Sequence, residues 1–111
     1  MTVKEIINEL ELEIVVNGDC EREVTGGYAG DLLSNVMAGA AKGDVWVTIQ
    51  GHQNVAAVAL LTEVAAVIIA EDAPIDEKTI ARAREKGVNI LQSSRPAFVI
   101  IGELYQLGVT G

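Results

Sequence analysis

The residues best suited to binding a ligand form a glycine-rich run, Gly26-Gly27-Tyr28-Ala29-Gly30-Asp31. Its glycines allow positive φ angles and a close approach between the backbone and a partner. We expect Asp31 to cap the helix that follows, whose free amides would point at the same spot. The run therefore predicts a ligand-binding turn, and the alternative is that the glycines only bend a strand into a helix.

The two common nucleotide fingerprints are absent from this run. No Lys-Ser or Lys-Thr pair follows the glycines, as a P-loop requires, and their spacing is not Gly-x-Gly-x-x-Gly. A capping carboxylate at Asp31 would also occupy the amides that a phosphate needs. A phosphate would therefore have to bind beside Asp31 or displace it.

A second polar loop, Gln50-Gly51-His52-Gln53-Asn54, is rich in amide and imidazole groups. Gln50, His52 and Asn54 can hydrogen-bond a sugar or the edge of a base, which suits a nucleotide-like ligand. His52 is the only histidine and Cys20 the only cysteine, so neither has a second such residue with which to complete a metal site. We expect no metal, no cofactor and no catalytic role for His52.

A third candidate lies at Ser93-Ser94-Arg95-Pro96, before the last predicted helix. Ser94 and Arg95 would place a hydroxyl and a guanidinium beside a helix N-terminus, which is the best anion site in the chain on simple electrostatics. The competing explanation is that Ser94 is an ordinary N-cap.

The order of the predicted elements favours an α/β fold. Strands alternate with helices across short loops, which implies right-handed crossovers and a mostly parallel sheet in a three-layer sandwich. The loops that follow the strands then meet at one edge of the sheet, where ligands bind in such folds. Asn17-Gly18 favours a tight hairpin between the first two strands. The expected helices cover residues 3–10, 32–43, 55–61, 77–86 and 94–108, and the expected strands cover 12–16, 20–25, 45–49, 65–70 and 88–91.

Length and charge narrow the classes of function. The 111 residues predict a single domain, residues 1–111. A formal net charge of -8 repels phosphodiesters and anionic lipid head groups, so we expect neither a nucleic acid nor a membrane as partner. One cysteine and no leader-like N-terminus favour a cytoplasmic location.

Two predicted helices are apolar on every side, at residues 55–61 and 97–101. In so small a domain such a helix needs a second covering surface, which is most simply another copy of the chain. We therefore expect a homodimer through the apolar helices. The alternative is that small alanines let the first of these helices be buried within the chain.

A longer pattern resembles the DRTGG domain family across essentially the whole chain. Its most specific parts are, in order, Gly30-Asp31-Leu32-Leu33-Ser34, Val47-Thr48-Ile49 and Asn54-Val55-Ala56-Ala57-Val58-Ala59. Glu21-Arg22 and Thr25-Gly26-Gly27 match the letters of the family name, with Glu in place of Asp. The resemblance implies a single DRTGG-like domain, with a fold similar to the N-terminal domain of HPr kinase/phosphorylase.

The same resemblance implies a regulatory role. Such domains accompany CBS domain pairs or phosphotransacetylase-type proteins, or stand alone, and supply no established catalytic residues. The chain also lacks the P-loop domain on which HPr kinase activity depends.

These observations predict a non-catalytic regulatory or sensory domain that binds a small metabolite or nucleotide-like ligand as a homodimer. The alternative is a protein-interaction or assembly domain with no small-molecule ligand. An enzyme is the third possibility and would need Asp31, His52 and Ser94 in mutual contact.

Overall fold

Five strands form one sheet in the order β1-β5-β4-β3-β2 in the computed structural model, which describes all 111 residues. Strands β2 to β5 run parallel, and β1 pairs antiparallel with β5 at one edge. The expected mostly parallel sheet is therefore confirmed. The strands are β1 (Glu13–Val16), β2 (Gly26–Ala29), β3 (Asp44–Thr48), β4 (Ala66–Ile69) and β5 (Ile90–Gln92).

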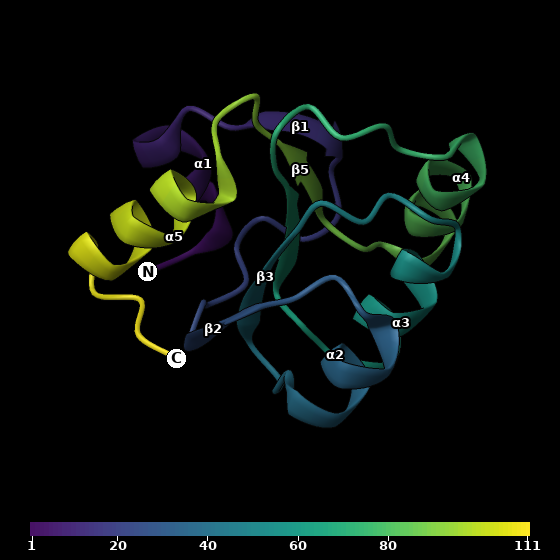
Figure 1. Cartoon of the computed structure of the whole chain (residues 1–111), viewed down its shortest axis with the longest axis horizontal. Coiled ribbons are helices and arrows are strands. Elements are labelled where there is room, and N and C mark those ends of the chain that lie inside the picture. Colours follow the sequence, from purple (N-terminus) through teal and green to yellow (C-terminus); the bar gives the residue numbers. More distant parts are fainter.

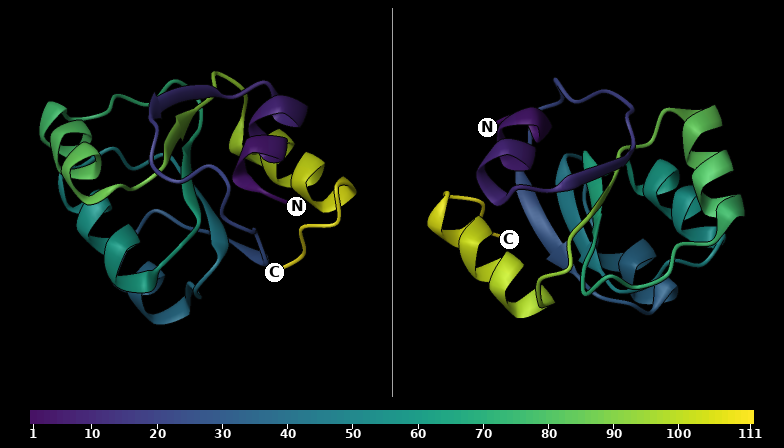
Figure 2. Two further views of the ribbon diagram at one scale, coloured as in Figure 1. Left: turned by 180° about the vertical axis from the view of Figure 1, so that it is seen from behind. Right: turned by 90° about the horizontal axis from the view of Figure 1, so that it is seen from above.

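Helices cover both faces of the sheet and complete three layers (Figures 1 and 2). Two helices, α1 and α5, lie on one face beside the chain termini, and the other three lie on the opposite face. The predicted α/β sandwich is thus confirmed. The helices are α1 (Val3–Leu10), α2 (Leu33–Gly39), α3 (Asn54–Thr62), α4 (Glu77–Lys86) and α5 (Ala97–Gln106).

Alternate residues of each inner strand enter the two cores. In β3, Val45 and Val47 join the core under α1 and α5, whereas Trp46 joins the core under the other three helices. All three side chains are buried. Because both faces are covered, the centre of the strand, Val45 to Val47, is an unbroken apolar run, as parallel strands usually are.

Two helices, α1 and α4, begin and end where their sequences predict. The hydroxyl of Thr2 accepts a hydrogen bond from the amide of Glu5, whose carboxylate accepts one from the amide of Thr2. This is a complete capping box. Asp76 caps α4, and Gly87 ends it in the left-handed conformation.

The predicted hairpin at Asn17-Gly18 is wrong. Strand β1 pairs with β5 instead, and residues 20–25 form no strand beyond one isolated bridge. Side chains hold this segment in place, because Asn89 accepts a hydrogen bond from the amide of Gly18 and donates one to the carbonyl of Asp19. The long-range pairing with β5 therefore overrides the local turn preference.

The helix expected over residues 32–43 is shorter, because α2 ends at Gly39. The carboxylate of Asp44 accepts a hydrogen bond from the amide of Ala41 at 2.8 Å, and Gly43 has a φ of 86°. These two features turn the chain directly into β3.

The apolar helix α3 is covered within the chain, between α2 and α4 (Figure 1). Its small and β-branched residues face the core, and Leu60 and Leu61 are the exposed exceptions. Burial within the chain, the alternative considered for this helix, therefore accounts for Val55, Ala56, Val58 and Ala59 but not for the two leucines. Neither α3 nor any other helix has the length and apolar character needed to span a membrane.

Candidate functional site

The structure divides the predicted binding residues between the sheet and its carboxyl edge. The loops that follow β2, β3 and β5 bring six of them to this edge: Gly30, Asp31, Gln50, His52, Ser94 and Arg95. The other four lie within elements: Gly26, Gly27 and Tyr28 in β2, and Asn54 at the start of α3.

The glycine-rich run is a strand over most of its length, and the expected turn with positive φ angles is wrong. None of its three glycines has a positive φ. Gly26 is needed for space instead, since a Cβ there would lie 2.7 Å from the Oδ1 of Asp44 on β3. Pairing with β3 extends the segment and buries Gly26 in the sheet.

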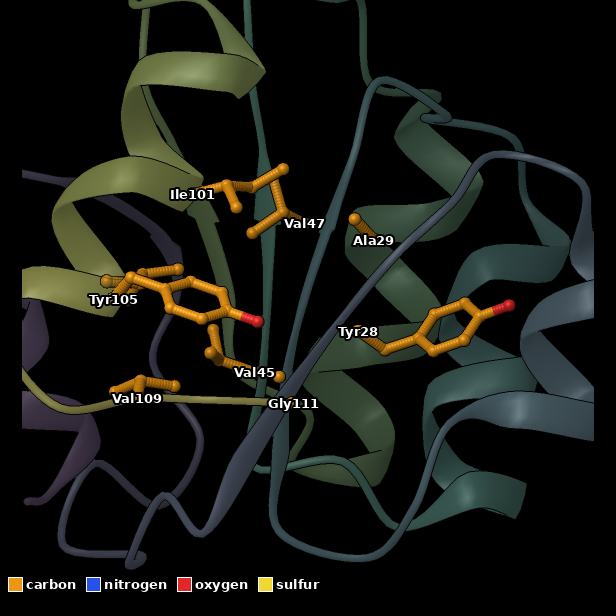
Figure 3. A pocket seen from close by; sticks show the side chains of 10 residues that line it. Tyr28, Ala29, Val45, Val47, Ile101, Tyr105, Val109 and Gly111 are labelled. Atoms are coloured by element: carbon orange, nitrogen blue, oxygen red, sulfur yellow. The ribbon is translucent and has the colours of Figure 1, made fainter.

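The side chain of Tyr28 packs against α2. Its hydroxyl donates a hydrogen bond to the carbonyl of Asn35 at 3.2 Å. Gly39 makes room for the ring, because a Cβ there would lie 2.6 Å from the Cε1 of Tyr28. Figure 3 shows this ring pointing away from Tyr105, so the side chains of the two tyrosines lie on opposite faces of the sheet.

Asp31 does not cap α2. Leu32 is the N-cap and makes no side-chain hydrogen bond. The carboxylate of Asp31 instead accepts hydrogen bonds from the hydroxyl of Thr48 at 2.8 Å and the amide of Ile49 at 2.9 Å. Asp31 therefore ties the end of β2 to the end of β3 and occupies the donors found there.

The loop after β3 folds around its own polar groups. The side chain of Gln50 accepts a hydrogen bond from the amide of His52, and the Nδ1 of His52 accepts one from the amide of Asn54. The carbonyl of Gly51 accepts hydrogen bonds from the hydroxyl of Thr79 and from the amide of Asp76. A shallow hollow of about 400 Å³ remains between this loop and the start of α4, lined by Ile49, Gln50, Gly51, His52, Pro74, Ile75 and Asp76.

Carboxylates of the chain itself pair with donors at the expected anion site of Ser94 and Arg95. The guanidinium of Arg95 forms an ion pair with Glu103 on α5. The carboxylate of Glu71 accepts a hydrogen bond from the amide of Ala97 at 3.1 Å, which satisfies the start of α5. Ser94 is not the N-cap, because α5 begins after Pro96 without a side-chain cap.

The loop after β4 adds backbone strain to this edge. Glu71 and Asp72 are consecutive residues in the left-handed region, with φ angles of 61° and 49°. Their amides donate hydrogen bonds to the carbonyls of Arg95 and Ser93, which hold this conformation. Such strain is typical of binding and switch regions, and the residue types alone gave no signal of it.

A second hollow lies between the sheet and α5, on the side of β2 opposite the Tyr28 ring (Figure 3). The sequence did not predict it. Its volume is about 180 Å³ and its walls are mainly apolar. Side chains of Val45, Val47, Ile101 and Tyr105 face it, and the backbone of β2 closes one side. We call this hollow the α5 cleft. The only signal for it in the sequence is the apolar character of residues 97–101.

The role of Arg22 is another feature that the sequence did not reveal. Its guanidinium donates hydrogen bonds to the carbonyls of Val64 and Glu63, both at 2.8 Å. It thereby satisfies carbonyls at the end of α3 and anchors the segment that leads into β2. Arg22 and Gly26, two of the residues that match the letters of the family name, are therefore explained by packing.

Cys20 lies in the same segment and is partly buried. Burial raises the pKa of its thiol, and the neighbouring Asp19 and Glu21 raise it further. The thiol donates a hydrogen bond to the side chain of Asn17. Elsewhere, no three His, Cys, Asp or Glu side chains come together in a group that could hold a metal ion.

A family model described as the DRTGG domain matches residues 5–107. Comparison with curated protein sequences finds no significant match. Among solved structures, the chain is similar to the CBS and DRTGG domains of the regulatory region of Clostridium perfringens pyrophosphatase, a structure complexed with the activator diadenosine tetraphosphate. The TM-score is 0.77 at 14% identity, covering 99% of this chain and 50% of that one. The chain therefore shares the fold and spans about half the length of that regulatory region.

Proposed function

This chain belongs to the DRTGG domain family, and from that membership we propose that it is a non-catalytic regulatory module that works as a homodimer joined through α5. The observation that carries the proposal is Phe98, whose side chain is 87% exposed on this helix. Val99 and Tyr105 are also exposed along α5. Several large apolar side chains exposed on one helix are typical of an interaction site.

The non-catalytic part is supported by the contacts of the three residues that an enzyme would use. Asp31 is bonded to Thr48 and Ile49, and the Nδ1 of His52 accepts the amide of Asn54. No hydrogen bond joins any two of Asp31, His52 and Ser94. General acid–base catalysis needs such contact, or one bridging water.

Light scattering after gel filtration tests the dimer. We expect a species of twice the 11.7 kDa mass of the chain, which dissociates on dilution. Loss of the dimer in high salt would show a polar interface, whereas an apolar one persists. A mass of 11.7 kDa at every concentration contradicts the proposal.

A second candidate function is the binding of a nucleotide-like metabolite at the carboxyl edge of the sheet. It is supported by the shallow hollow beside Gln50 and His52, and by the nucleotide activator held by the structurally similar regulatory region. The carboxylates of Asp31, Glu71 and Glu103 oppose a phosphate at this edge, because each already occupies a donor that a phosphate would use. A base or sugar edge in the hollow is therefore favoured over a phosphate.

Equilibrium unfolding with and without diadenosine tetraphosphate and ATP tests this second function. A ligand at 100 times its dissociation constant adds about 2.7 kcal/mol to the free energy of unfolding. His52→Ala should remove this gain, and Gln53→Ala, next to it on the same loop but outside the hollow, should retain it. No gain with either nucleotide contradicts binding of this class.

A further inference from the structure

One face of α5 carries four residues at helical spacing: Phe98, Ile101, Gly102 and Tyr105. Positions i, i+3, i+4 and i+7 lie on one side of a helix. Phe98 and Tyr105, at the two ends of this stripe, are 87% and 57% exposed. The stripe therefore presents two aromatic rings to solvent with a glycine between them.

The α5 cleft runs beside this stripe and shares Ile101 and Tyr105 with it. Its volume of about 180 Å³ suits one aromatic ring, since a dry protein cavity of about 150 Å³ binds benzene. Phe98, at the other end of the stripe, does not line the cleft of its own chain.

No contact within the chain explains why residue 102 is a glycine. Glycine weakens a helix interior, and a Cβ at this position would meet no atom within 4 Å. Its φ is not positive. A close approach by the backbone of a second helix is a contact that would require glycine here.

We propose that two copies pair through antiparallel α5 helices that cross at Gly102, each placing Phe98 in the α5 cleft of the other copy, against Tyr105. A two-fold axis between residues 101 and 102 relates position 98 of one copy to the level of position 105 of the other. The same contact therefore forms twice, as an isologous interface demands. This inference rests on the proposed homodimer and specifies its geometry.

Charge does not oppose a second copy at the surface of α5 itself. Each copy carries a formal charge of -8, so two copies repel unless their contact is apolar. Glu103 is the only charged residue of α5, and Arg95 of the same chain neutralises it. Helix α5 itself thus brings no unpaired charge into the contact.

Disulfide trapping tests the geometry directly. Two variants are made in a Cys20→Ser background, one with Phe98→Cys and the other with Tyr105→Cys, and are mixed, allowed to exchange subunits and oxidised. We expect a cross-linked dimer from the mixture and little from either variant alone. Positions 98 and 98 of the two copies would be about 10 Å apart along the helix axis, too far for a disulfide.

Substitutions give a second, independent measurement. Phe98→Ala should raise the dimer dissociation constant about 30-fold or more, as loss of a central aromatic anchor does. Leu61→Ala is the matched control, because Leu61 is also an exposed apolar residue but lies on α3, on the other face of the sheet. Gly102→Gln should weaken the dimer while the fold remains intact by circular dichroism.

The outcomes separate this inference from the proposed homodimer. A wild-type monomer overturns both. A wild-type dimer that persists in Phe98→Ala and gives no cross-link between positions 98 and 105 overturns only the geometry, and shows that another face joins the copies. A dimer weakened by Phe98→Ala and trapped by the mixed cysteines supports both.

Discussion

The carboxylate of Asp31 and the hydroxyl of Thr48 lie 2.8 Å apart and join the ends of β2 and β3. Thr48 is almost fully buried, and the same carboxylate oxygen also accepts the amide of Ile49. The aspartate of the glycine-rich run therefore stabilises the sheet edge and leaves the helix after it uncapped.

Removing this carboxylate should destabilise the fold. Asp31→Ala leaves the Thr48 hydroxyl and the Ile49 amide without their partner, and we expect a loss of about 1–3 kcal/mol in the free energy of unfolding. Asp31→Asn keeps one acceptor oxygen and should cost less. Urea unfolding at fixed protein concentration measures both. In a double-mutant cycle with Thr48→Val, purely additive effects would contradict the hydrogen bond.

Gly26 and Gly27 should respond differently to alanine, although they are neighbours in one strand. A Cβ at Gly26 would lie 2.7 Å from a carboxylate oxygen of Asp44, whereas at Gly27 its nearest atom would be 3.5 Å away. We expect Gly26→Ala to cost about 1–3 kcal/mol, as overpacking does, and Gly27→Ala to cost clearly less. Equal costs in thermal or urea unfolding would contradict this steric explanation.

Arg22→Lys should lose most of the anchor at the end of α3. A lysine ammonium cannot reproduce the two parallel hydrogen bonds that the guanidinium donates to Val64 and Glu63. We expect a cost of about 1–2 kcal/mol in the free energy of unfolding. Arg84→Lys, on the exposed side of α4, is the control and should stay within about 0.5 kcal/mol of the wild type.

How far the sequence predicts the fold depends on how local the signals are. The capping box of Thr2 and Glu5, and the Asp76 and Gly87 caps, define α1 and α4 because their partners lie within a few residues. Strand β2 was missed because its extended form depends on pairing with β3, about 18 residues away. The choice of β5 as the partner of β1 is likewise a tertiary contact that no turn signal encodes.

The same distinction applies to the candidate site. Parallel topology predicts that the strand-end loops share one edge, and it brings Asp31, His52 and Arg95 there. The partners that fill this edge come from elsewhere in the chain: Glu71 satisfies the start of α5, and Glu103 neutralises Arg95. Pairings of this kind depend on the folded geometry, so residue type alone does not show which donors at this edge are already paired.

The Glu5 carboxylate should make stability depend on pH. Its hydrogen bond from the Thr2 amide lowers the pKa below the ordinary value of 4.5. A carboxyl group with a lowered folded-state pKa favours folding when ionised, so its contribution is present above pH 4.5 and is lost as pH falls through the folded pKa. The stability difference between wild type and Glu5→Gln should therefore narrow as pH falls from about 5 to 3. A constant difference over this range contradicts the assignment.

Gly102→Ala should change folding and association in opposite directions. Within one chain a methyl group at this position meets no atom within 4 Å, and alanine favours a helix interior by about 1 kcal/mol over glycine. In a Phe98→Ala background, where the dimer is weakened, urea unfolding should therefore show a gain of up to about 1 kcal/mol. In the wild-type background the same methyl group would lie where the two helices cross, and light scattering should show a weaker dimer. A loss of stability in the Phe98→Ala background would show that Gly102 serves the fold of the single chain and would remove its role at the interface.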